Sequence, residues 1–172
     1  MTLEIISFVV FALLAIASAL LVITAKHPVV SAMSMIFHFF MLAGLYLTLS
    51  AQFIAVMQVM VYAGAIMVLV VFAIMLLNLG DEGKLRSGFN FRKLVAWFLG
   101  GALAVQIAVL LSNGALSNTA ISEKASELGT AQVIGGELFT NYIYPIEIVG
   151  ILLFAAIVGA IYMAKKNLPT EE

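Results

Sequence analysis

Residues 53–79 read FIAVMQVMVYAGAIMVLVVFAIMLLNL and contain no charged side chain. A bilayer core about 30 Å thick needs roughly 20 apolar residues in a helix, so this stretch is long enough to cross a membrane. Drawn as a plain helix it would be about 40 Å long, which exceeds the apolar slab. The stretch therefore predicts a membrane-spanning helix with tilt or a local irregularity.

The composition of the whole chain agrees with that interpretation. Of its 172 residues, 64% are hydrophobic and 10% are charged, and the mean hydropathy is +1.17. Soluble domains average about 45–50% apolar and about 25% charged residues. The sequence therefore predicts an integral membrane protein.

Charged residues mark the ends of the predicted spans. Uncharged intervals cover residues 5–25, 27–80, 94–122 and 148–164, and the second is long enough for two crossings with a turn at Ser50–Gln52. Helices are expected because lipid leaves no water to satisfy an exposed backbone. We predict an all-α, polytopic fold in one membrane domain (1–172), with five transmembrane helices at about 4–24, 29–50, 53–79, 94–113 and 143–164.

The basic residues predict the orientation. Seven of the eight fall on one side, which the positive-inside rule assigns to the cytoplasm: Lys26, Lys84, Arg86, Arg92, Lys93, Lys165 and Lys166. Only Lys124 falls on the other side. The N-terminus is therefore expected outside and the C-terminus in the cytoplasm, with a cytoplasmic loop 80–93, an outer loop 114–142 and a cytoplasmic tail 165–172. The first span lacks a basic leader and a cleavage pattern, so we expect it to be retained.

Several chemistries are excluded by the residues themselves. Eight basic residues nearly balance nine acidic ones, which argues against nucleic-acid binding. The chain has no cysteine to form a thiolate zinc site or an iron–sulfur cluster, and no glycine-rich loop follows a strand to bind NADH or ATP. His27 and His38 would lie about 16 Å apart along one helix, too far to flank one haem.

Two ionisable residues fall inside predicted spans. Charged or ionisable groups in a membrane are functional candidates by default. His38 fits either a packed, hydrogen-bonded interior residue or a proton relay. Glu147 lies near the outer end of the fifth helix, where it fits either structural anchoring or proton handling.

The third predicted helix has a patterned face. Small residues at 63–65 would let a neighbouring helix approach closely. At α-helical spacing one face contains, in order, Gln58, Tyr62, Ala65, Leu69 and Phe72. The outer half of this face is polar and the inner half is apolar. Spacing alone favours a packing role, in which the two polar side chains bond to a neighbouring helix.

Residues 61–78, VYAGAIMVLVVFAIMLLN, resemble the third helix of subunit J of proton-pumping NADH:quinone oxidoreductase (respiratory complex I), the bacterial counterpart of mitochondrial NADH dehydrogenase subunit 6. Residues 26–29 (KHPV) look like the family's first loop, and residues 138–142 (LFTNY) with Pro145–Glu147 look like its entry to the fifth helix. Gln58 departs from relatives that carry an acid there, which places a proton-carrying role at that position in doubt.

The resemblance implies a non-catalytic subunit of the membrane arm, in the bacterial cytoplasmic (inner) membrane, that helps couple quinone reduction to proton translocation. It would lie beside the K, A and H subunits, while FMN, iron–sulfur clusters and quinone would bind to partner subunits. It also implies a π-bulge near the 62–69 stretch. One inserted residue rotates everything beyond it by about 100°. The implied gating residues are Tyr62, Gly64, Ala65, Leu69 and Phe72.

Two other classes of function fit parts of the pattern. An independent small transporter or channel would ordinarily need polar or ionisable residues deep in several helices, and this chain has few. A structural subunit of a related hydrogenase or cation-antiporter complex would use the same third helix for packing alone.

Overall fold

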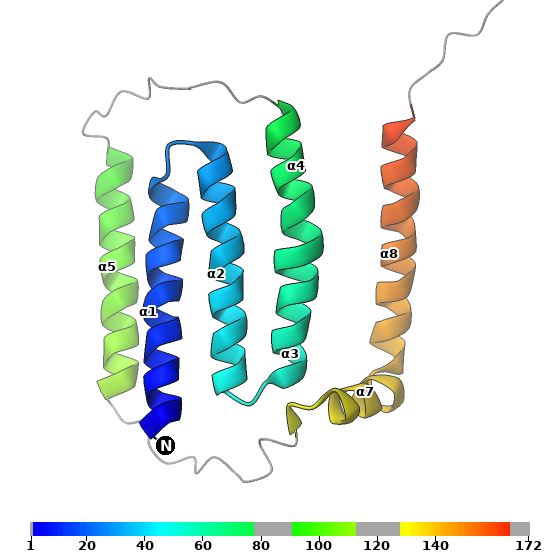
Figure 1. The fold of residues 1–172 in the computed structure, drawn as a ribbon, viewed down its shortest axis with the longest axis horizontal. Coiled ribbons are helices and arrows are strands. Elements are labelled where there is room, and N and C mark those ends of the chain that lie inside the picture. The colour runs from blue at the N-terminus through cyan, green and yellow to red at the C-terminus, as the bar shows by residue number, and fades with distance from the viewer. Residues whose placement is uncertain (1, 78–90, 113–127, 166–172) are drawn as a thin grey trace, which may run out of the picture.

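The computed structural model describes residues 2–77, 91–112 and 128–165 (Figure 1). Every regular element in these residues is a helix, which confirms the predicted all-α class. Residues 80–90 of the expected cytoplasmic loop, residues 114–127 of the expected outer loop and residues 166–172 of the tail lie outside the described residues.

Helices α1 (Thr2–Thr24) and α2 (Pro28–Thr48) form an antiparallel hairpin (Figure 1). Pro28 occupies the first turn of α2, where its missing N–H costs no hydrogen bond. The two helices approach closely at Gly44, where an added Cβ would lie 2.7 Å from the ring of Phe11. This hairpin is the most extensively packed pair of helices in the described residues.

The third span is one continuous run of helix with three segments. It consists of α3 (Gln52–Met57), the π-helix η1 (Gln58–Ile66) and α4 (Met67–Leu77). The chain reverses between α2 and α3 at Leu49–Ala51, where Ser50 has a φ of +61°. All three segments pack against α2, so α2 is the central helix of the packed group.

Two further long helices follow, α5 (Phe91–Ser112) and α8 (Ile143–Ala164). Within the described residues, four helical runs are long and apolar enough to cross a membrane: Leu3–Thr24, Pro28–Thr48, Gln52–Leu77 and Ile143–Ala164. In α5 the corresponding apolar run, Val95–Leu110, is shorter. The structure thus supports four spans, and a fifth crossing by α5 stays a prediction.

A short helix, α7 (Ala131–Thr140), lies in the segment that the sequence suggested only as a loop. It runs across the ends of the long helices where α3 and α8 begin, and it packs against both (Figure 1). The side chain of Thr130 caps its N-terminus. Just before this cap, the carbonyl of Gly129 accepts a hydrogen bond from the N–H of Phe53 at 3.0 Å. These contacts attach α7 to the start of the third span.

Buried residues are few and mostly small, as expected where membrane helices pack by close approach rather than by the hydrophobic effect. They are Ala15, Ser18, Ala32, Ala43, Gly44, Ala55, Gln58, Ala63 and Met67. No residue of α8 is buried. Long apolar faces therefore remain available to lipid or to other chains.

Candidate functional site

The irregular third span is the strongest candidate site. Its nine-residue π-helix lies between two α-helical segments, in the middle of a membrane crossing. π-helical turns are rare and occur frequently at functional sites. The observed segment starts at Gln58 and ends at Ile66, so it overlaps the 62–69 stretch implied by the resemblance but begins four residues earlier.

The spacing of the buried residues in the third span shows that the π segment contains one extra residue. Along the third span the buried positions are Ala55, Gln58, Ala63 and Met67. Their separations are three, five and four residues. Steps of three and four belong to an α-helix, whereas a step of five matches the i→i+5 hydrogen bonding of a π-helix. The π segment therefore sets which residues beyond Gln58 face α2.

This register differs from the face expected at α-helical spacing. Gln58 is 7% exposed, but Tyr62 is 47%, Leu69 is 70% and Phe72 is 64% exposed. Ala65 is exposed as well. The physical reason is the widened turn, which places the fifth residue after Gln58, rather than the fourth, on the α2 side.

Gly64 lies inside the π-helix and is half-buried. A Cβ built there would be 3.2 Å from the backbone oxygen of Val59, closer than an ordinary van der Waals contact. This oxygen lies five residues earlier in the same π-helix and so belongs to the helix's own backbone. The absence of a side chain lets the backbone change conformation at low cost.

Tyr62 is linked to α2 by aromatic packing. Its ring centroid lies 5.5 Å from that of Phe39, with the ring planes inclined by 55°. Phe39 in turn lies 6.0 Å from the ring of His38. These separations are typical of favourable aromatic pairs. A row of three rings therefore connects the π-helix with the interior of the α1–α2 hairpin.

His38 bonds to α1 rather than to the third span. Its Nδ1 lies 3.0 Å from the backbone oxygen of Ala15 and 3.2 Å from Oγ of Ser18. The sequence alone did not predict Ser18 or Ala15 as partners of His38. The available signal was the hydroxyl of Ser18, the one polar side chain in the apolar run 8–23 of the first helix.

Glu147 is not brought to the third span. It lies in the second turn of α8, its side chain is exposed, and within the described residues α8 packs only against α7. The neighbouring polar contact, from Asn141 Nδ2 to Glu137 Oε2 at 2.7 Å, stays within α7 and its C-cap.

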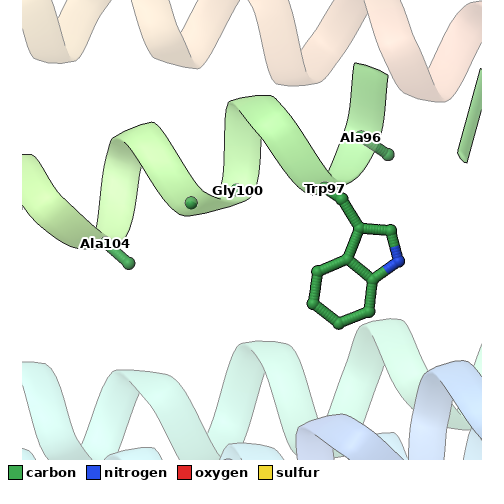
Figure 2. A pocket seen from close by; sticks show the side chains of 5 residues that line it. Ala96, Trp97, Gly100 and Ala104 are labelled. Atoms are coloured by element: carbon green, nitrogen blue, oxygen red, sulfur yellow. The ribbon is translucent and has the colours of Figure 1, made fainter. Parts of the chain in front are cut away.

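A hollow beside α5 is apolar and offers little for a ligand. It is lined by Ala96, Trp97, Gly100, Gly101 and Ala104, and Figure 2 shows the Trp97 ring extending from the helix beside three of the small residues. Small residues four apart allow close packing of a membrane helix. Among the described residues no group of three or more His, Asp or Glu is placed to hold a metal ion.

Taken together, the fold and the site define a multi-pass, all-helical membrane protein with a π-helix in its third span. Comparison with known proteins gives the family. Residues 18–163 match the family model for NADH-ubiquinone/plastoquinone oxidoreductase chain 6, and the chain belongs to this family.

Three relatives illustrate the match. NAD(P)H-quinone oxidoreductase chain 6 of Leptolyngbya boryana is 36% identical over 98% of this chain and 84% of its own length. F(420)H(2) dehydrogenase subunit J of Methanosarcina mazei is 38% identical over 91% of this chain and 89% of its own length. NADH-quinone oxidoreductase subunit J of Rickettsia prowazekii is 30% identical over 93% of this chain and 80% of its own length. The chain is a membrane-arm subunit of the complex I type.

Proposed function

We propose that this subunit helps couple quinone reduction to proton translocation, with the third span as a gate that changes helical register. The observation that carries the proposal is the five-residue step between the buried residues Gln58 and Ala63. At this step, one residue more or fewer in the helical turn changes which side chains face α2. The chain itself is non-catalytic in this account.

The alternative register follows from helix geometry. If the π turn relaxes to an α turn, everything beyond it rotates by about 100°. Tyr62 then takes the place of Ala63 beside α2, and Ile66 takes the place of Met67. Leu69 and Phe72, which now point away from α2, turn towards it. The face predicted from α-helical spacing would thus exist in the second state.

Such a rotation would change hydration along the third span. In the π form the large apolar side chains of Leu69 and Phe72 lie on the outer surface of the packed group. In the α form they would line the α2 side and change the space available to water there. Bistable packing of this kind is how a small backbone change becomes a discrete switch. Gly64 supplies the backbone freedom, and the small side chain of Ala65 leaves room for the rotation.

The redox groups are proposed to lie on partner subunits. The three relatives carry names with three different electron donors, NAD(P)H, F(420)H(2) and NADH. A subunit shared among them fits a position away from the donor site. FMN, iron–sulfur clusters and quinone would be held by other chains, and the absence of cysteine here fits that assignment. This evidence favours a subunit of a large complex over an independent transporter.

Neighbouring subunits would cover the faces that this chain leaves open. The unburied surface of α8 and the small-residue side of α5 suit helix–helix contacts in a bilayer. We propose the K, A and H subunits as these neighbours, and α5 as a fifth crossing. We also propose a bacterial inner membrane as the location, and the basic residues favour a cytoplasmic C-terminus there.

The Gly64→Val substitution tests the gate. Valine adds β-branched bulk against the carbonyl of Val59 and stiffens the backbone. We expect an assembled complex whose coupled turnover falls at least about tenfold, the effect of roughly 1.4 kcal/mol on a rate-limiting switch. The matched control is Gly159→Val in α8, where an added Cβ meets nothing within 4 Å. Assembly is checked first by copurification of the flavin and iron–sulfur subunits. Equal activity in both variants would contradict the gate.

A further inference from the structure

The α1–α2 hairpin is joined by two hydrogen bonds from side chains of α2 to carbonyls of α1. Ser31 Oγ donates to the oxygen of Val22 at 2.7 Å. His38 Nδ1 contacts the oxygen of Ala15 at 3.0 Å. The donors are seven residues apart, and so are the acceptors, which is the repeat of two helices packed side by side. His38 and Ser31 therefore occupy equivalent places along the hairpin.

Because Ser31 makes the equivalent bond with its hydroxyl, a hydroxyl is enough to join the two helices in this way. A histidine in the equivalent place brings a second ring nitrogen, which the bond to α1 does not use. His38 is also the eleventh of the 21 residues of α2, and thus lies at the middle of the span. Ionisable side chains at that depth are rare and usually functional.

The contacts determine which nitrogen carries the fixed proton. A carbonyl oxygen can only accept, so Nδ1 must be the donor to Ala15. The hydroxyl of Ser18 donates to the same carbonyl at 2.9 Å, so towards Nδ1 it offers a lone pair at 3.2 Å. Ser18 is 2% exposed. A buried hydroxyl and a carbonyl thus hold one side of the ring in one orientation.

The other nitrogen, Nε2, is open. Within the described part of the chain no hydrogen bond engages it. No unpartnered polar side-chain atom among the described residues is fully buried, so Nε2 retains accessible surface. In the neutral ring, with Nδ1–H fixed, Nε2 holds the lone pair.

We infer that Nε2 of His38 is a proton-binding site at the centre of the membrane domain. A proton from water adds to the Nε2 lone pair and later returns to water, and no other bond forms or breaks. The charge strengthens the bonds from Nδ1–H to Ala15 and Ser18, because hydrogen bonds from an ionised donor are stronger than neutral ones. The site thus has acceptors already aimed at the charged ring.

Few other ionisable groups lie on the helices around this site. On α1 the only charged residue is Glu4, in the first turn, and on η1 the only titratable one is Tyr62. Segments α3 and α4 carry none. On α2 itself Tyr46 lies two turns further along. The hydrogen-bond partners of the ring among the described residues are therefore the two groups on α1.

The test uses the assembled complex in membrane vesicles, because the inference rests on the proposed role in proton translocation. His38→Asn keeps an N–H donor near the position of Nδ1 but removes the ring that binds a proton. The initial rate of proton pumping is measured from about pH 5.5 to 8.5, the range in which histidines usually titrate. We expect the variant to lose one inflection of the wild-type profile. The control Ser31→Ala removes the other bond to α1 and should keep the shape of that profile.

Ser18→Ala provides an independent arm, because it keeps His38 and its bond to Ala15 while removing the hydroxyl. Its profile should be displaced along the pH axis relative to wild type. If either His38→Asn or Ser18→Ala assembles and keeps the wild-type pH profile of proton pumping, His38 only joins the helices. One assembled variant of the two is enough for this test. If the wild-type complex itself reduces quinone without moving protons, the proposed function fails instead.

Discussion

Tyr62 stands at the boundary between the two registers of the third span. In the present register its ring packs against Phe39 and about half of its surface is exposed. Relaxation of the π turn would carry Tyr62 from this half-exposed contact with α2 into the buried place of Ala63, where its hydroxyl would need a partner or water. The ring and the hydroxyl therefore have separable roles.

Replacement of Tyr62 by Phe keeps the ring contact and removes only the hydroxyl. We expect normal assembly and a loss of coupled turnover of roughly two- to tenfold, the effect of one hydrogen bond made in one state only. Steady-state quinone reduction and proton pumping in the same vesicles measure this. Tyr62→Ala, which also removes the ring, should be worse, and an unaltered Tyr62→Phe rate would show that the hydroxyl has no part in switching.

Glu147 has a different setting, since its carboxylate is exposed on α8 and lies apart from the third span. Its place in the second turn of the helix lets the side chain reach interfacial water. We predict that Glu147→Gln assembles and retains at least about half of the quinone reductase activity, as exposed substitutions usually do. Loss of pumping in an intact complex would instead establish a proton-handling role.

Among the secondary structure elements, α7 connects the start of the third span with the start of α8. Its anchor is the hydrogen bond from Phe53 N–H to Gly129, whose backbone lies directly against Ser50. A Cβ at Gly129 would collide with the backbone oxygen of Ser50, which has no flexible side-chain end to move aside. The contact therefore depends on glycine.

Gly129→Ala should detach α7 from the turn and destabilise the subunit by about 1–3 kcal/mol, the usual cost of overpacking. Gly135→Ala is the matched control, because its Cβ would meet nothing within 4 Å. Thermal melting of the purified complex and limited proteolysis near residue 129 compare the two. Indistinguishable melting curves would mean that the anchor contributes nothing.

The long helices were predictable from sequence because lipid requires every backbone group to be bonded internally, and the charged residues delimit the apolar runs. The register of the third span was not predictable from spacing. It depends on which side of η1 meets α2, and α-helical spacing places Tyr62 rather than Ala63 beside Gln58. The helix α7 was missed because ten residues with two glycines give no span-length signal. The bond from His38 to Ala15 depends on tertiary contact across the hairpin.

For the whole molecule, orientation and the number of crossings are linked. If α5 crosses the membrane, residue 87 lies in the cytoplasm and residue 126 lies outside, as the basic residues predict. Single cysteines at Ser87 and Ser126, in a chain that has none of its own, should be labelled by an impermeant thiol reagent from opposite sides. Labelling of both from one side would remove α5 from the spans, and reversed labelling would invert the orientation.

A high-resolution map of the complete complex trapped in two functional states would show whether the third span has two registers. In one state we expect η1 to be π-helical with Ala63 and Met67 facing α2, as here. In the other state an α-helical turn should rotate Leu69 and Phe72 by about 100° towards α2. A third span that keeps the π register, with Leu69 and Phe72 pointing away from α2 in every trapped state, would contradict the account.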